Sequence, residues 1–198
     1  MGQLTLQPDA AAGKDAYLNE PTPDTNYGGG SVQMKGIVNS KRHSILEFDI
    51  SSIPAGATID SATLFLSEQG GAQLTTGELV RMTQAGWVEL EATWNQYANG
   101  SNWTTSGGDA DTTQRTTFTT IGNGEGSVDA LDAQPHCQDA LDNRSGLVRL
   151  LIRPTETGWS VGWHSSDSTT ASKRPKLVVN YTPSGGGGAA GGDVAFIA

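Results

Sequence analysis

Residues 44–68 contain two runs of alternating apolar and polar residues with a turn between them. In the first run, Ile45, Phe48 and Ile50 are interleaved with polar residues, and in the second run apolar residues fall near every second position. Pro54 lies between the runs, where it fixes φ and removes a hydrogen-bond donor. A period of two predicts strands with one buried and one solvent-facing side. The sequence therefore predicts an antiparallel sheet built around a central hairpin.

Eight further segments have strand-like patterns, at residues 4–6, 16–18, 32–38, 79–83, 116–121, 147–153, 159–165 and 176–182. A short helix is expected within residues 126–145, starting after Pro135 and ending before Gly146. A parallel α/β fold would need helices between the strands, and the sequence has no such pattern. We predict an all-β, two-sheet antiparallel sandwich of the jelly-roll type, with about eight to ten strands.

The composition divides the chain into two parts. Residues 1–183 form the predicted sandwich domain, and residues 184–198 are a Gly-rich linker followed by a short apolar end. That end has nothing obvious to bury it within the chain, so we expect it to dock on a neighbouring subunit. The alternatives are a cloning scar or a tail packed on its own domain. The predicted docking residues are Asp193, Val194, Phe196 and Ile197.

The chain is acidic, with a formal net charge of -9 and a pI near 4.6. Such a surface repels phosphates, which argues against nucleic-acid binding, and it disfavours an anionic polysaccharide unless calcium bridges the two. No apolar run approaches membrane-spanning length. A single cysteine, Cys137, excludes an internal disulfide and is interpreted as a half-buried structural residue. No secretion signal opens the sequence, so we expect synthesis and folding in the cytoplasm.

Four separated blocks resemble the DNRLRE-type, or disaggregatase-related, domain family. The blocks are NYGGG at 26–30, Arg42 with LEFDISSIPAGATIDSATLFL at 46–66, the tryptophan motifs at 87–89 and 92–95, and RPKLVVNY at 174–181. The resemblance implies a β-jelly roll similar to carbohydrate-binding modules. Such modules accompany secreted polysaccharide-degrading enzymes and adhesins and also occur in phage proteins, and some related members bind acidic polysaccharides.

The sequence lacks a catalytic constellation. Its three histidines, His43, His136 and His164, have no metal-ligand spacing, and there is no nucleophile elbow, phosphate loop or cysteine pair. Glu89 and Glu91 would share one face of a strand and could form a glycosidase pair, but the resemblance places Glu89 beside a structural tryptophan. We predict that the chain is not an enzyme.

Loops rich in Asp, Asn and carbonyl oxygens can bind calcium, which is the one cofactor that we consider. The candidate ligands are Asp15, Glu20, Asp24 and Asp109. Turn formation is the alternative role for these residues, because Asp and Asn stabilise turns in most proteins.

Exposed aromatic rings hold sugars by stacking on the apolar face of the pyranose. The candidates outside the recurring motifs are Tyr97, Trp103, Tyr27 and Trp159, of which Tyr97 and Trp103 lie in the long aromatic connection at 86–109. Burial in the core is the alternative for each of them.

Two functions remain open. The first is a non-catalytic virion structural protein, of the capsid-decoration or tail-associated type, that docks on other assembly subunits through its C-terminal end and also binds surface glycans. The alternative is a free, extracellular carbohydrate-binding module of a polysaccharide-targeting or adhesion system. The sequence favours the first by a narrow margin.

The docking hypothesis makes a direct prediction for the C-terminal end. Deletion of residues 184–198 should abolish incorporation of the protein into its particle, as measured by the composition of purified particles. Particles that keep the truncated protein at full occupancy would contradict the hypothesis.

Overall fold

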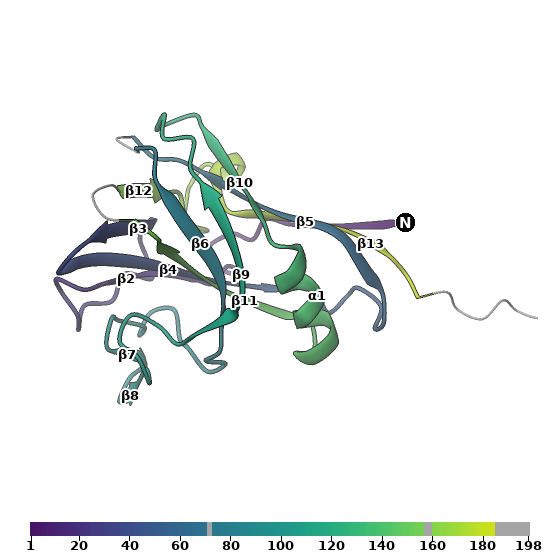
Figure 1. Ribbon diagram of the computed structural model, residues 1–198, viewed down its shortest axis with the longest axis horizontal. Coiled ribbons are helices and arrows are strands. Elements are labelled where there is room, and N and C mark those ends of the chain that lie inside the picture. Colours follow the sequence, from purple (N-terminus) through teal and green to yellow (C-terminus); the bar gives the residue numbers. More distant parts are fainter. Residues whose placement is uncertain (71–72, 157–159, 185–198) are drawn as a thin grey trace, which may run out of the picture.

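The computed structural model describes residues 1–70, 73–156 and 160–184, in which two antiparallel sheets form a sandwich (Figure 1). The four-stranded sheet has the order β1 (Gly2–Leu6), β13 (Lys176–Thr182), β5 (Thr58–Ser67) and β10 (Val128–Asp132). The seven-stranded sheet has the order β12 (Ser160–Trp163), β3 (Val32–Ile37), β4 (Ser40–Asp49), β11 (Leu147–Pro154), β6 (Thr76–Met82) and β9 (Ala110–Thr119), with β2 (Asp15–Asn19) also paired to β4. The predicted all-β sandwich is confirmed.

Every segment predicted to be a strand overlaps a strand of the structure. Three short strands were not predicted, namely β7 (Gln96–Ala98), β8 (Ser101–Asn102) and β10. β7 and β8 form a separate two-stranded ribbon inside the aromatic connection. In β10, Asp129 and Leu131 are the buried residues. A buried acid breaks the expected alternation of apolar and polar residues, which is why the pattern did not reveal this strand.

The predicted central hairpin is wrong, because β4 and β5 belong to different sheets. The connection between them carries Ile50, Ile53 and Ala57, which are almost completely buried between the sheets. Gly56 has φ of 77°, which completes the turn. The chain therefore crosses the core at this corner and does not fold back beside β4.

The central strands of the larger sheet are buried on both faces. In β11, Leu150 and Ile152 pack in the core between the sheets, whereas Leu151 packs in a second apolar cluster on the opposite face. In β4, Leu46 likewise packs in the core between the sheets, and Ile45 packs in the second cluster on the opposite face. The expectation of one solvent-facing side is thus wrong for β4. It is correct for β5, where buried and accessible residues alternate along most of the strand.

The helix α1 (Gln134–Asn143) lies at one end of the sandwich and packs on β5 and β11, and a 3₁₀ turn, η1 (Ala171–Lys173), precedes β13 (Figure 1). The helix lies within the predicted range, but it begins at Gln134, so that Pro135 is in its first turn and does not precede it. Burial raises the pKa of Cys137 on this helix to about 12, so the thiol stays protonated at neutral pH. Among the described residues, no helix is both long and apolar enough to cross a membrane.

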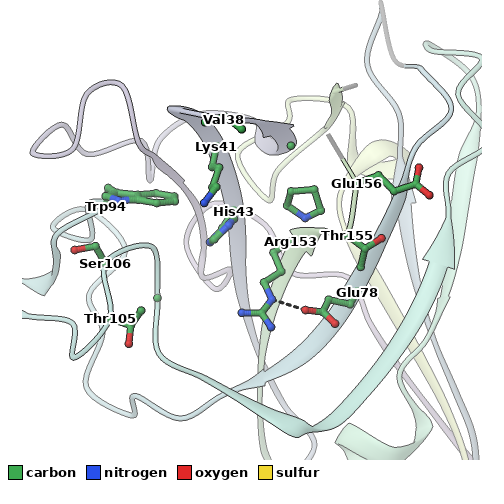
Figure 2. Close-up of a pocket in the computed structure, with 13 residues that line it drawn as sticks. Val38, Lys41, His43, Glu78, Trp94, Thr105, Ser106, Arg153, Thr155 and Glu156 are labelled. Carbon is green, nitrogen blue, oxygen red and sulfur yellow. Dashed lines mark hydrogen bonds and ion pairs between the residues drawn. The ribbon is translucent and has the colours of Figure 1, made fainter. Parts of the chain in front are cut away.

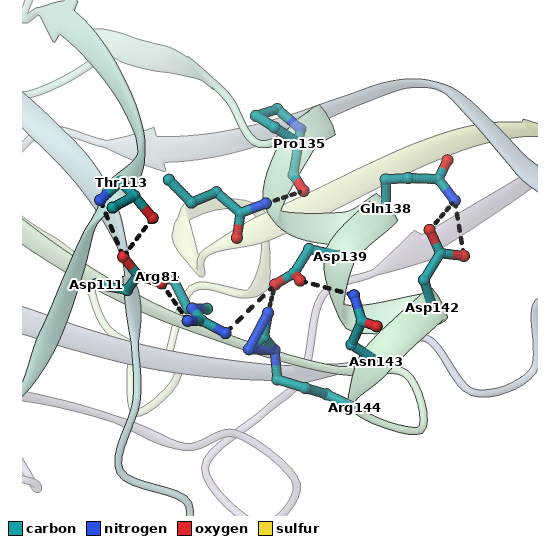
Figure 3. A network of polar contacts seen from close by, with 10 residues as sticks. Arg81, Asp111, Thr113, Pro135, Gln138, Asp139, Asp142, Asn143 and Arg144 are labelled. Carbon is teal, nitrogen blue, oxygen red and sulfur yellow. Dashed lines mark hydrogen bonds and ion pairs between the residues drawn. The ribbon is translucent and has the colours of Figure 1, made fainter.

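A charged network fixes the outer side of α1 (Figure 3). Asp139 pairs with Arg144, which follows the helix. Oδ2 of Asp139 also lies 3.9 Å from Nη1 of Arg81 in β6. Arg81 also pairs with Asp111 of β9, whose Oδ1 accepts hydrogen bonds from Thr113. Two arginines shared between two acids join the helix to the edge of the large sheet.

The buried acid Asp129 should make stability depend on pH. Burial raises the pKa of Asp129 above its ordinary value of 3.8, and the adjacent Glu68 carboxylate adds to the increase. As pH rises from about 4, the unfolded chain loses this proton before the folded chain does, so the free energy of unfolding falls.

Urea denaturation at pH 4, 5, 6 and 7 should therefore show a loss of stability that is smaller in Asp129→Asn. Each unit of pKa difference corresponds to about 1.4 kcal/mol. Parallel pH profiles for the two proteins would contradict this assignment.

Candidate functional site

The long connection between β6 and β9 covers the outer face of the seven-stranded sheet. Its side chains pack with residues from β2, β4, β6 and β11 in an apolar cluster that we call the outer cluster. The buried members of the outer cluster are Ala16, Leu18, Ile45, Val80, Met82, Trp87, Ala92, Trp94, Trp103 and Leu151. The aromatic connection is thus packed against the outer face of the sheet and forms a wall on that face.

Two glycines allow the connection to approach the sheet closely. Gly108 has φ of 104°, and a Cβ at this position would lie 2.4 Å from Cδ1 of Leu151. Gly107 has φ of 90°, and its Cβ would lie 2.8 Å from the ring of Trp94. Side chains larger than hydrogen would therefore lift this wall from the strands.

A cleft of about 440 Å³ lies beside this wall, over the outer face of β4, β6 and β11. Figure 2 shows Lys41, His43 and Arg153 at its centre, with Trp94 on one side and Glu156 on the other. The complete lining consists of Gly36, Val38, Lys41, His43, Glu78, Trp94, Thr105, Ser106, Gly108, Arg153, Pro154, Thr155 and Glu156. An open cleft on the face of a sheet, lined by both polar and apolar groups, can admit part of an extended ligand.

The floor of the cleft is held in place by ion pairs. Arg153 Nε donates to Oε1 of Glu78, whose other oxygen lies 3.6 Å from Arg115 Nη1 (Figure 2 shows the first pair). Lys41 has no ion-pair partner among the described residues. The Lys41 ammonium and the remaining Arg153 nitrogens are therefore the donors available to a ligand.

His43 contributes a neutral ring. Its centroid lies 4.9 Å from that of Trp94, and burial lowers the pKa of His43 to about 4. The ring nitrogen Nδ1 lies 2.7 Å from the carbonyl oxygen of Gly107, so Nδ1 carries the proton and donates it. Nε2 is left as a hydrogen-bond acceptor, which matches a sugar hydroxyl.

A comparison with known protein families identifies the type of domain. The sequence profile of carbohydrate-binding module family 96 (CBM96) matches residues 7–181. The chain belongs to this family. None of the curated proteins compared with this sequence matches it. The match supports a domain of the carbohydrate-binding-module type, whereas the narrower resemblance to DNRLRE-type domains stays a prediction. Modules of this kind bind without catalysis, which is consistent with the expectation that the chain is not an enzyme.

Three of the four aromatic residues predicted to bind sugar, namely Tyr27, Tyr97 and Trp103, lie outside the cleft lining of this CBM96 module. Trp103 is only 5% exposed and its Nε1 donates to the carbonyl oxygen of Thr93, so its ring is packed in the outer cluster. Tyr97 packs edge-on against Trp103, and Tyr27 stacks on Tyr17 with ring centroids 4.3 Å apart. Trp159 lies outside the described residues, as do the predicted docking residues Asp193, Val194, Phe196 and Ile197.

The predicted calcium ligands do not come together as one group in the described part of the chain. Glu20 accepts the backbone N–H of Lys41, Asp24 accepts from Asn95, and Asp109 accepts the backbone N–H groups of two threonines. These three acids therefore stabilise loops, as the alternative reading proposed. Asp15 differs, because it meets two other carboxylates.

The charged floor of the cleft is not evident from the sequence. Lys41, Glu78 and Arg153 come from three strands that are far apart in sequence, so no local pattern groups them. One signal in the sequence is the alternation of side chains along a strand, which places residues i and i+2 on the same face. His43 and Arg153 each lie two residues from a member of the outer cluster, Ile45 and Leu151, and so share its face.

A substitution at Trp103 tests whether its ring anchors the aromatic connection or stacks on a sugar. Trp103→Phe removes the donor to Thr93, so we expect the free energy of unfolding to fall by about 2 kcal/mol in urea denaturation. Because the ring lies outside the cleft, glycan affinity of the folded variant should change less than about twofold. A large loss of affinity with unchanged stability would instead support the stacking role.

Proposed function

We propose that this CBM96 module binds an acidic polysaccharide in the cleft over the seven-stranded sheet. The observation that carries the proposal is the pair of cationic groups, Lys41 and Arg153, on the floor of the cleft. Family membership supports carbohydrate as the class of ligand. The charge preference is our inference from the lining residues.

The charge of the cleft differs from that of the whole chain. The lining contains two cations, Lys41 and Arg153, and two acids, Glu78 and Glu156. Arg115, which is not in the lining, pairs with Glu78 as Arg153 does. The lining is thus balanced, although the chain carries a net charge of -9. Because Glu78 is already paired with two arginines, a uronate carboxylate would meet donors there and not an unpaired acid.

Neutral groups in the cleft suit the hydroxyls of a sugar chain. His43 supplies an acceptor, and Thr105 and Ser106 supply hydroxyls from the aromatic wall. The Arg153–Glu78 pair is fixed within the sheet, so a ligand would meet a preorganised surface. These groups explain recognition of a glycan, and Lys41 and Arg153 explain a preference for an acidic one.

Binding should be measured by calorimetry and by affinity electrophoresis with polyuronates and with neutral glucans. We expect the polyuronates to bind more tightly, and we expect binding to weaken as salt is added, because salt screens exposed charges. Preferential binding of neutral glucans that is insensitive to salt would overturn the charge preference. Binding to neither class would overturn the cleft assignment.

Lys41→Ala is the most direct variant, because Lys41 is exposed and unpaired among the described residues, so its loss leaves no buried charge. We expect polyuronate affinity to fall about tenfold with little change in stability. Lys176→Ala is the matched control. Lys176 lies over Phe65 on the smaller sheet, 4.8 Å from the ring centroid, and its replacement should leave binding unchanged. Equal effects of the two substitutions would contradict the proposed site.

The virion role stays a prediction. Incorporation into a capsid or tail, docking through residues 184–198, the division of the chain at residue 183 and the location of the protein in a virion or outside cells rest on the sequence alone. Glycan binding by the cleft is compatible with a particle protein and with a free module.

A further inference from the structure

Three carboxylates from separate segments meet beside β2, away from the cleft lining. Asp15 begins β2, Glu89 belongs to the aromatic connection, and Asp167 follows β12. One oxygen from each side chain lies within 4.8 Å of the oxygens from the other two. Like charges at this separation repel one another strongly unless a cation lies between them.

Some of the oxygens in this cluster are buried without a hydrogen-bond partner. Asp15 is 2% exposed, and its Oδ2 accepts the backbone N–H of Ser166 at 2.9 Å. Oδ1 of Asp15 and Oδ2 of Asp167 are buried and accept no hydrogen bond. A buried carboxylate oxygen without a hydrogen-bond partner destabilises the folded protein, so the arrangement calls for a ligand.

Protein cations do not neutralise the cluster. Lys14 is adjacent to Asp15 in sequence, but its Nζ binds Glu47 at 3.1 Å and lies 4.4 Å from the ring centroid of Trp87. Among the described residues, no ion pair reaches Asp15, Glu89 or Asp167. Burial raises the pKa of Asp15 to about 6 and that of Glu89 to about 7, and the neighbouring carboxylates add to both increases.

We propose that Asp15, Glu89 and Asp167 bind a calcium ion. Calcium accepts six to eight oxygen ligands in irregular geometry, so three carboxylates with water and backbone oxygens would suffice. Magnesium requires a more regular octahedron and suits such a cluster less well. The sequence prediction of calcium named Asp15, but the partners that the structure gives it are Glu89 and Asp167.

The ion would join three parts of the fold. Asp15 lies in the edge strand β2, and Asp167 lies in the segment before η1. Glu89 lies in the aromatic connection, which also supplies Trp94 and Thr105 to the cleft lining. Calcium would thus stabilise the aromatic connection at its base. The inference does not depend on which glycan the cleft binds.

The experiment uses the full chain after treatment with a chelator. Calcium chloride is added during calorimetry and during thermal unfolding, with magnesium chloride in a parallel series. We expect saturable binding of one calcium per chain and a rise in Tm of about 5 °C or more at saturation. Absence of binding and of any Tm shift up to roughly 10 mM calcium, or an equal response to magnesium, would overturn the proposal.

Asp167→Asn is the diagnostic variant, because it removes one negative charge and keeps the shape of the side chain. Without calcium its Tm should exceed that of the unaltered protein, since repulsion within the cluster is reduced. With calcium the order should reverse, because its calcium affinity should be at least tenfold weaker. A purely structural acid would not produce this reversal.

Two further variants locate the site. Glu89→Gln should also weaken calcium binding, whereas Asp24→Asn, an acid that pairs with Asn95, should keep the full calcium response. Undiminished calcium binding in both Asp167→Asn and Glu89→Gln would place the ion elsewhere and overturn the assignment.

Discussion

Burial of both faces of β4, β6 and β11 is the constraint on which the rest of the structure depends. Adjacent residues in these strands, such as Leu150 and Leu151, point into two different apolar clusters. One cluster joins the two sheets, and the other holds the aromatic connection against the outer face. Removal of apolar surface from water on both sides fixes the register of these strands, because a shift by one residue would exchange the two faces.

The cleft follows from the same constraint. The outer cluster covers only part of the outer face, and the polar residues that continue the strands beyond it, His43 and Arg153, are left in the open part. The wall that borders them is rigid because Trp94 and Trp103 are anchored in the cluster. The tryptophans of this module therefore shape the cleft by positioning a loop, while charged side chains on the sheet form its floor.

The sequence was sufficient to predict ten of the strand segments, the helix and the sandwich, because period-two patterns such as that of β5 report one buried face directly. It was not sufficient to predict the partners of each strand. The corner at Ile53 looks like a hairpin turn, and only its burial shows that the chain changes sheets. Cleft residues such as Lys41 and Arg153 could not be grouped from sequence. They are brought together by the pairing of distant strands, and local sequence patterns do not record that pairing.

Two acidic groups in this protein show how hydrogen bonding distinguishes a structural acid from a ligand. Glu68 and Asp129 are both buried, and their four oxygens accept backbone and indole N–H groups at 2.7 Å. Asp15 is equally buried but leaves one oxygen without a donor. The first pair is complete within the protein, whereas the unpartnered oxygen of Asp15 supports our proposal that the second group binds a cation.

The central claim is that the outer face of the seven-stranded sheet, beside the anchored aromatic connection, is the ligand-binding face. Titration of the ¹⁵N-labelled protein with an oligosaccharide of the bound glycan tests it most directly, because amide chemical shifts report which backbone segments meet the ligand. The account predicts that the largest shifts will fall at residues 36–43, 105–108 and 153–156. Shifts concentrated on β1, β13 and β5 of the four-stranded sheet would contradict it.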